Sequence, residues 1–166
     1  EYQSLAKQLG RDRKLIKTYV SILEDSFLIK TLGNYRKSNL ASLRKTKKVY
    51  PTDTGIISAY KETIDDQFLG RMVETAVANH VDAKFFWKNS HEVDLVAKKP
   101  IEVKYQNKII DSDLSALRYC MAKFSFKEAL LLSKEQERSV EVEEGRIDIK
   151  PVLSFLLGYS AEQKKC

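Results

Sequence analysis

The sequence predicts an α/β protein in which helices pack on a mixed β-sheet, with a small basic region ahead of it. Two patterns predict this fold class: some segments repeat apolar residues at helical spacing, and others alternate apolar with polar residues as strands do. These segments follow one another as a helix, a run of strands, a second helix and a further strand. That order favours an α/β sandwich around a mixed central sheet.

The charge distribution sets the basic region apart from the rest of the chain. Residues 1–50 hold 12 Lys and Arg against 4 Asp and Glu, whereas residues 51–166 hold 17 against 19. An excess of positive charge confined to one part of a chain indicates an anionic partner for that part.

Composition narrows the classes of protein to consider. A chain of 166 residues forms one domain or two small ones. No apolar stretch approaches the ~20 residues that a membrane span needs, so we expect no membrane partner. Cys120 falls on an apolar helical stripe and Cys166 on the tail, so they make no disulfide framework, and the histidines and cysteines lack zinc-ligand spacing. We therefore expect a cytoplasmic protein.

The basic region, residues 1–55, has the pattern of a winged-helix-like domain. A short helical pattern is followed by a turn at Gly10 and a longer helix, an arrangement typical of a helix-turn-helix. Two predicted strands, residues 27–32 and 47–50, flank a polar, basic segment that would be a wing. The first helix of a complete winged helix is not evident and could lie upstream of residue 1. The apolar stripe of the longer helix consists of Ile16, Tyr19, Val20 and Leu23.

We expect this region to bind nucleic acid, most readily DNA, through contacts to phosphate. Winged helices also dock on proteins, so a protein partner is the alternative. The residues expected to contact nucleic acid are Arg11, Arg13, Lys14, Lys17, Arg36, Lys37, Arg44 and Lys45.

The second region, residues 56–166, is predicted to contain the sheet. Helical spacing of apolar residues over 68–81 predicts a helix, and residues 85–88 form a short aromatic strand beside the next strand. The later elements are a helix capped by Asp111 or Ser112 and running through Met121, a buried strand over 128–133, a hairpin over 139–149, and a short apolar helix from Pro151 that ends at Gly158.

Two carboxylates and a lysine lie on two short apolar runs joined by a turn. Alternation along a strand places Glu102 and Lys104 on one face. Asp94, on the preceding strand, reaches that face only if it pairs with Glu102 or Lys104, and both registers need a three-residue loop or a bulge. The segment Lys98–Pro100 suits such a loop. A two-residue hairpin with regular strands would place the two carboxylates on opposite faces.

This set of side chains suits a magnesium-dependent phosphodiesterase. Mg²⁺ takes oxygen ligands, often one or two carboxylates plus waters, so Asp94 and Glu102 are the expected ligands of Mg²⁺ or Mn²⁺. Lys104 can orient water or stabilise developing charge. Glu74, at the margin of the apolar helical stripe, is a third candidate ligand and catalytic residue. Gln106 continues the face of Lys104 and could touch substrate.

Simpler interpretations stay open for these residues. Alternating apolar and charged residues describe any half-exposed hairpin, so the carboxylates could face water. Glu74 could likewise reach solvent or pair with Arg71 or His80.

The order of helix Glu74, strand Asp94, then Glu102-x-Lys104 resembles the PD-(D/E)xK nuclease superfamily, without the Pro of its name. Together with the helix-turn-helix and the segment Lys48–Gly55, residues 4–135 resemble the carboxy-terminal region of a family of predicted bacterial and archaeal AAA-type ATPases. The resemblance implies a winged helix followed by a restriction-endonuclease-like domain, and an ATPase domain upstream. The chain itself has no phosphate-binding loop of that ATPase type.

We therefore expect a Mg²⁺-dependent DNA endonuclease or phosphodiesterase domain of a larger AAA-type ATPase. The alternative is a catalytically silent module of that ATPase that binds DNA or a partner. A homo-oligomer is compatible with either function.

Overall fold

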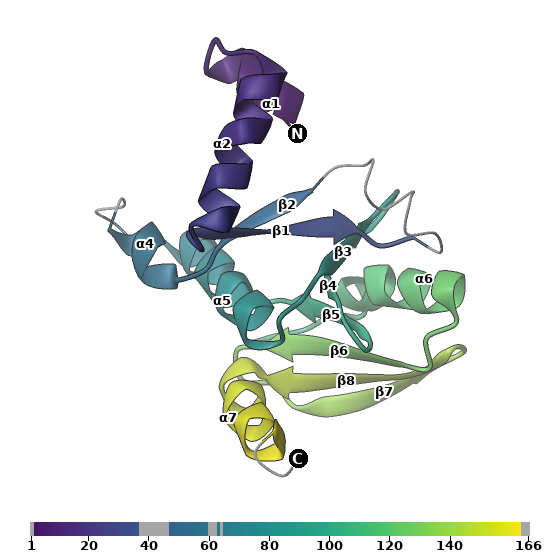
Figure 1. Cartoon of the computed structure of the whole chain (residues 1–166). Coiled ribbons are helices and arrows are strands. Elements are labelled where there is room, and N and C mark those ends of the chain that lie inside the picture. The colour runs from purple at the N-terminus through teal and green to yellow at the C-terminus, as the bar shows by residue number, and fades with distance from the viewer. Residues whose placement is uncertain (1, 37–46, 60–62, 64, 164–166) are drawn as a thin grey trace.

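A computed structural model describes residues 2–36, 47–59, 63 and 65–163, and the side chains up to residue 158. Within these residues, one eight-stranded mixed sheet in the order β2-β1-β3-β4-β5-β6-β8-β7 is accompanied by six α-helices (Figure 1). The predicted α/β class with a mixed central sheet is confirmed. Every helix in these residues is too short or too polar to cross a membrane.

The strands are β1 (Ile29–Asn34), β2 (Lys48–Pro51), β3 (Phe85–Lys88), β4 (Glu92–Val96), β5 (Pro100–Val103), β6 (Glu128–Ser133), β7 (Arg138–Val142) and β8 (Gly145–Pro151). The helices are α1 (Tyr2–Gln8), α2 (Arg13–Asp25), α4 (Thr54–Ser58), α5 (Asp66–His80), the 3₁₀ turn η1 (Asp111–Leu114), α6 (Ser115–Phe124) and α7 (Val152–Gln163). β3, β4 and β5 form an antiparallel meander, and β5, β6 and β8 run parallel.

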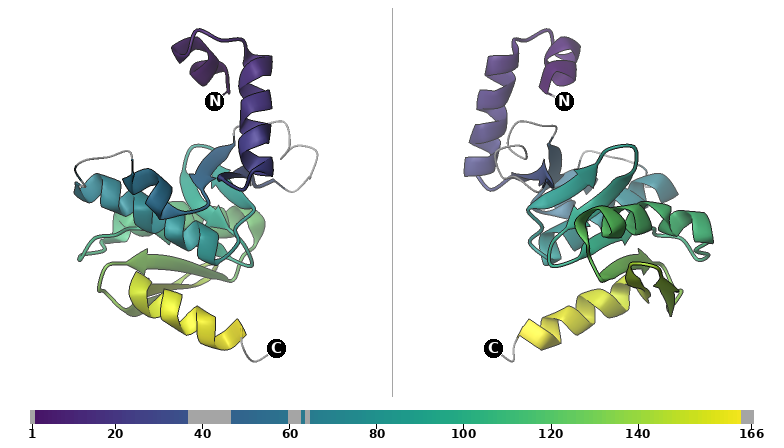
Figure 2. Two further views of the ribbon diagram at one scale, coloured as in Figure 1. Left: turned by 60° about the vertical axis from the view of Figure 1, so that its left-hand side comes forward. Right: turned by 90° about the vertical axis from the view of Figure 1, so that its right-hand side faces the viewer.

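The core lies on both faces of the sheet, and β6 shows why. Its alternate residues Ala129 and Leu131 pack in the cluster under α6, whereas Leu130 and Leu132 pack in the cluster under α5 and α7. A strand covered on both faces needs a continuous apolar run, which is what the sequence of β6 provides. Figure 2 shows α6 on one side of the sheet, with α5 and α7 on the other.

The strands of the basic region are the first strands of this same sheet. β1 pairs antiparallel with β2, and it also pairs in parallel with β3, Gly33 opposite Phe85 and Asn34 opposite Phe86. The helices α1 and α2 project away from the sheet (Figures 1 and 2). The Glu24 carboxylate ties the end of α2 to β1 by accepting hydrogen bonds from the Thr31 amide and hydroxyl.

Three details bear on the sequence expectations. On α2, Ile16 and Val20 are buried, but Tyr19 and Leu23 of the same predicted stripe are exposed. The helix expected to end at Gly158 continues to Gln163, since a glycine inside a helix costs only about 1 kcal/mol. Cys120 is fully buried, as its place on the helical stripe predicted.

Candidate functional site

The β4–β5 hairpin brings Asp94 next to Glu102. Leu95 pairs with Ile101 and Val96 with Pro100, and the two acidic residues directly follow the Leu95–Ile101 pair. The connection consists of Ala97, Lys98 and Lys99, so the predicted three-residue loop is confirmed. It begins one residue earlier than expected because Pro100 already belongs to β5.

A bulge in β4 lies at the same point. Val93 pairs with Trp87 and Val96 with Phe85, so β4 uses one more residue than β3 between these two pairs. A bulge turns side chains away from regular alternation. Leu95 accordingly packs in the α5 cluster, whereas Val93 and Val96 pack in the α6 cluster.

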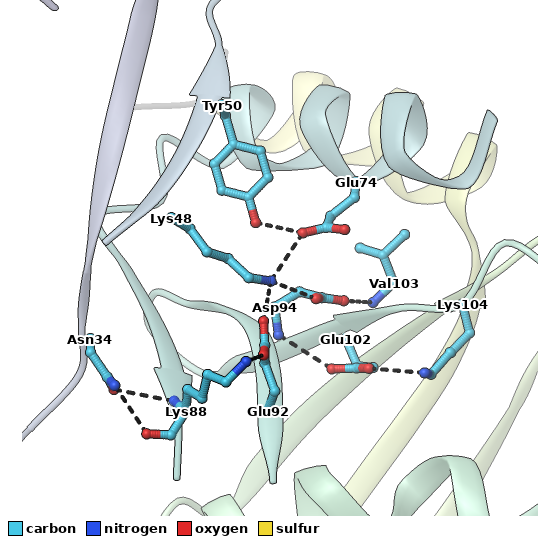
Figure 3. A network of polar contacts seen from close by, with 10 residues as sticks. All are labelled: Asn34, Lys48, Tyr50, Glu74, Lys88, Glu92, Asp94, Glu102, Val103 and Lys104. Atoms are coloured by element: carbon cyan, nitrogen blue, oxygen red, sulfur yellow. Dashed lines mark hydrogen bonds and ion pairs between the residues drawn. The ribbon is translucent and has the colours of Figure 1, made fainter. Parts of the chain in front are cut away.

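Next to the bulge, the two carboxylates bond to the backbone of the neighbouring strand. The Val103 amide donates to Asp94 Oδ2 at 3.1 Å, and the Asp94 amide donates to Glu102 Oε2 at 3.3 Å. Each carboxyl group therefore has a fixed position, set by β4 and β5 together. Figure 3 shows the two groups beside each other at the centre of the polar network.

Lys48, from β2, lies among three carboxylates. Its Nζ is 2.8 Å from Glu92 Oε1, 3.0 Å from Asp94 Oδ1 and 3.2 Å from Glu74 Oε1 (Figure 3). Burial lowers the pKa of Lys48, but the charges of these carboxylates, Asp94 foremost, outweigh it and the pKa is raised. Lys48 is thus a permanent cation inside the acidic cluster.

Glu74, from α5, is held by Lys48 and by Tyr50, whose hydroxyl donates to Glu74 Oε1 at 2.5 Å. Burial and the Asp94 charge raise the pKa of Glu74 against the effect of these two partners. Burial also raises the pKa of Tyr50, so its hydroxyl keeps its proton and acts as the donor. Neither Arg71 nor His80, the partners considered from sequence, is the neighbour that positions Glu74.

Glu102 and Lys104 form the other half of the site. Lys104 Nζ lies 3.3 Å from Glu102 Oε1, and the Lys104 amide donates to the Leu132 carbonyl at 2.8 Å, which fixes the residue against β6. Burial and the Asp94 charge raise the pKa of Glu102 to about 8. Burial lowers the pKa of Lys104, but its pairing with Glu102 prevails and the pKa is raised.

The site therefore contains residues that sequence reasoning missed. Lys48 and Tyr50 share a face of β2 because they are two residues apart, but nothing in the sequence placed β2 beside α5. Glu92 precedes Asp94 on β4, and its pKa is lowered because Lys48 and Lys88 outweigh the effect of its burial. The alternation of Glu92 with Asp94 was the available signal for a second acid on this strand.

Gln106 does not continue the strand as expected. β5 ends at Val103, and the Gln106 side chain donates to the Lys108 carbonyl and to Asp113 Oδ2, both at 3.1 Å. These bonds hold it in the connection between β5 and η1. The expectation that it extends the face of Lys104 along the strand is wrong because the ladder ends first.

The structure describes five of the residues that are predicted to contact nucleic acid. Arg11, Arg13, Lys14 and Lys17 are exposed on α2 and the turn before it. Arg36 instead donates to the Lys88 carbonyl at 3.0 Å. Lys37, Arg44 and Lys45 lie outside the described residues.

An open cavity of about 440 Å³ adjoins the cluster between β2 and α5. Lys48, Tyr50 and Glu74 belong to both the cluster and the wall of the cavity. The remaining wall residues are Val49, Ile57, Phe68, Arg71, Met72 and Thr75.

The donor chemistry of the site fits a hard divalent cation, with one complication. Asp94 and Glu102 offer carboxylate oxygens from paired strands, the ligand type that Mg²⁺ prefers. In the part of the chain that the structure describes, however, no three His, Cys, Asp or Glu side chains are grouped so that they could hold a metal ion.

Comparison with known proteins links only the first part of the chain to a family. The model of a domain of unknown function (DUF8612) matches residues 1–67. That match covers α1 to α4, including Lys48 and Tyr50, and stops before Glu74, Asp94 and Glu102. The comparison with curated proteins gave no match, and the comparison with solved structures gave none either.

Proposed function

We propose that this chain is a divalent-cation-dependent phosphodiesterase that acts on DNA. The observation that supports it most is the contact between Asp94 and Glu102 on neighbouring strands, where the Asp94 amide donates to Glu102 Oε2, with Lys104 Nζ 3.3 Å from Glu102 Oε1. Asp94 and Glu102 would hold Mg²⁺ or Mn²⁺, with Glu74 as a third carboxylate nearby. When bound, the ion supplies positive charge at the phosphate and an acidified water.

The side chains divide the remaining tasks. Lys104 keeps its charge and is fixed by β6, so it can orient water or stabilise charge on a phosphate oxygen. Tyr50 holds one oxygen of Glu74, which leaves the other oxygen for a ligand. The hydrogen bonds from backbone amides keep Asp94 and Glu102 in place without any bound ion.

The helices α1 and α2, which precede the sheet in the sequence, would bind the DNA. Arg13, Lys14 and Lys17 are exposed on α2, a projecting helix whose Ile16 and Val20 are buried. Contacts from such side chains to phosphate give affinity with little sequence preference. By resemblance, we further propose a winged-helix region followed by a restriction-endonuclease-like domain, in the cytoplasm, as part of a AAA-type ATPase whose ATPase domain lies upstream.

The test is DNA cleavage by matched pairs of variants. Asp94→Asn and Lys104→Met should abolish Mg²⁺-dependent cutting of circular and branched DNA. Asp148 is a matched control for Asp94, since their side chains are 13% and 15% exposed and both pair with a basic residue. Lys99 matches Lys104 in the same way, at 34% and 38% exposed.

Asp148→Asn and Lys99→Met should cut as the wild type does. Cutting by purified Asp94→Asn at the wild-type rate would refute the assignment.

A catalytically silent DNA- or partner-binding module is the second candidate. The position of Lys48 favours it, because an internal ammonium already pairs with Asp94, Glu92 and Glu74. For such a module, DNA binding would persist unchanged in Asp94→Asn, and the wild type would not cut with Mg²⁺ or Mn²⁺.

A further inference from the structure

The cavity between β2 and α5 has the size and the wall of a ligand site. Its volume of about 440 Å³ lies within the range of about 300–1,000 Å³ that small-molecule sites occupy. The apolar part of its wall comes from three elements and consists of Val49 on β2, Ile57 on α4, and Phe68 and Met72 on α5. A flat apolar group that enters the cavity would bury surface against this wall, which favours its binding.

Arg71 adds a cation to the same wall. It lies three residues before Glu74 on α5, a spacing at which the two side chains could pair. The Glu74 carboxylate is instead bonded by Lys48 and Tyr50. Among the contacts of the described residues, the exposed Arg71 guanidinium has no acidic partner. Its planar fork of N–H donors suits a phosphate group.

The two cations of the wall differ in how available their charges are. Lys48 Nζ already lies within 3.2 Å of three carboxylates, whereas Arg71 has no such neighbour among the described contacts. An anionic group that enters the cavity would therefore pair with Arg71, while a flat ring attached to it would lie against the apolar wall. A phosphate joined through a sugar to a flat ring is the chemistry of a nucleotide.

We propose that the cavity receives an unpaired nucleotide of the DNA, with its base against the apolar wall and its phosphate at Arg71. This inference rests on the proposed function, because it names the form of DNA that the protein takes, but this binding requires no metal ion. A base inside a duplex is paired and stacked, so it can enter a cavity only from a single strand or after it has flipped out. The preferred substrate is therefore DNA with a single-stranded part beside the acidic cluster, since Lys48, Tyr50 and Glu74 border both.

The first experiment measures, by fluorescence anisotropy, the binding of an oligothymidylate and of a duplex of equal length, in EDTA so that no DNA is cut. Arg71→Met should bind the single strand about tenfold more weakly than the wild type, and its slope of log K against log salt should be shallower by about 0.7 for the one lost phosphate contact. Its affinity for the duplex should be that of the wild type. Arg146→Met is the control, because it removes the same charge from an exposed arginine outside the cavity wall, and it should match the wild type with both DNAs.

The outcomes separate this inference from the proposed function. If Arg71→Met binds the single strand as tightly as the wild type, or loses equal affinity for the single strand and the duplex, the inference is overturned. Duplex binding by the wild type in either case leaves the proposed DNA contact of α2 standing. No binding of the wild type to either DNA would overturn both.

A second measurement uses the wild type alone and locates the bound base. An oligothymidylate that carries one 5-iodouracil is irradiated with the protein, and the cross-linked peptides are identified by mass spectrometry. Cross-links at Phe68 or Met72 that disappear when the oligonucleotide is annealed to its complement would support the proposal. Cross-links confined to α2, or equal in the single strand and the duplex, would overturn it.

Discussion

At the scale of single residues, Lys48 and Glu102 respond to burial in opposite ways. Both lose water, which penalises the charged form of each. Three carboxylates surround Lys48 and keep it charged, whereas Glu102 has the Asp94 charge beside it as well as Lys104, and its pKa rises to about 8. The protein therefore stabilises the buried charge of Lys48 and disfavours that of Glu102.

The raised pKa of Glu102 predicts a pH-dependent stability. Between about pH 4.5 and 8 the folded protein holds a proton that the unfolded chain releases, so stability falls as pH rises through this window. Glu102→Gln removes this titration. In denaturant unfolding, the free energy of unfolding of the variant should increase relative to that of the wild type from pH 5 to pH 9, by at most about 1.4 kcal/mol per pH unit.

Glu128→Gln is the control, because Glu128 is exposed and its pKa is lowered by Lys99, which places its titration below this window. Parallel stability curves for Glu102→Gln and the wild type would contradict the prediction.

At the scale of elements, the β4–β5 hairpin determines whether the site exists. The three-residue connection fixes the register, and the period of two along a strand then decides which side chains meet. The bulge in β4 adds a second adjustment, which separates Leu95 from Val93 and Val96. The length of this loop therefore matters for the site as much as the acidic residues do.

Deleting Lys98 should therefore disconnect the two carboxylates. A two-residue connection shifts β5 by one position relative to β4 and turns Glu102 away from Asp94. We expect a lower melting temperature and loss of any rise induced by Mg²⁺. The measurement is thermal melting with and without Mg²⁺, since a ligand of the native state raises the melting temperature.

Lys98→Ala keeps the loop length and should retain the Mg²⁺ effect. A folded deletion variant that is stabilised by Mg²⁺ as much as Lys98→Ala would show that the register does not matter.

The hairpin also marks what the sequence could predict and what it could not. The three-residue connection between β4 and β5 followed from local rules, namely the strand period and the number of loop residues. Lys48 could not be found this way, because its partners lie on α5 and β4 and only tertiary packing brings β2 to them. Gln106 was misplaced for a related reason, since where the ladder ends depends on β6 as much as on β5.

At the scale of the whole molecule, one sheet joins two regions of different charge. The sequence indicated a basic unit and a near-neutral unit, yet β1 and β2 of the basic part extend the sheet that carries the acidic cluster. The distribution of charge along a sequence indicates which partners a surface attracts, not which strands pair. It therefore could not predict that the two regions share one sheet. The exposed Tyr19 and Leu23 show a similar limit: helical spacing predicts an apolar stripe, but not whether a neighbour covers all of it.

The projecting basic helix predicts salt-dependent DNA binding. Replacing Lys14 and Lys17 together by Ala should weaken binding to duplex DNA of any sequence. The slope of log K against log salt should become shallower by about 1.8, that is, about 0.9 for each phosphate that the variant no longer neutralises. Fluorescence anisotropy across a salt series measures both quantities.

The matched control replaces Lys108 and Lys127, exposed lysines of the second region, and should leave affinity and slope unchanged. Equal slopes for the two double variants would exclude α2 from the interface.

The parallel pairing of β1 with β3 has a consequence for the order of folding. Gly33 and Asn34 pair with Phe85 and Phe86, so the β1–β2 hairpin, which ends at Pro51, can form early but joins the sheet only after the chain has extended a further 34 residues, from 51 to 85. During synthesis, α1, α2 and this hairpin emerge long before β4 and α5 have closed over each other. Lys48 can contact Glu74 and Asp94 only once α5 and β4 are in place, because these partners lie 26 and 46 residues further along the chain.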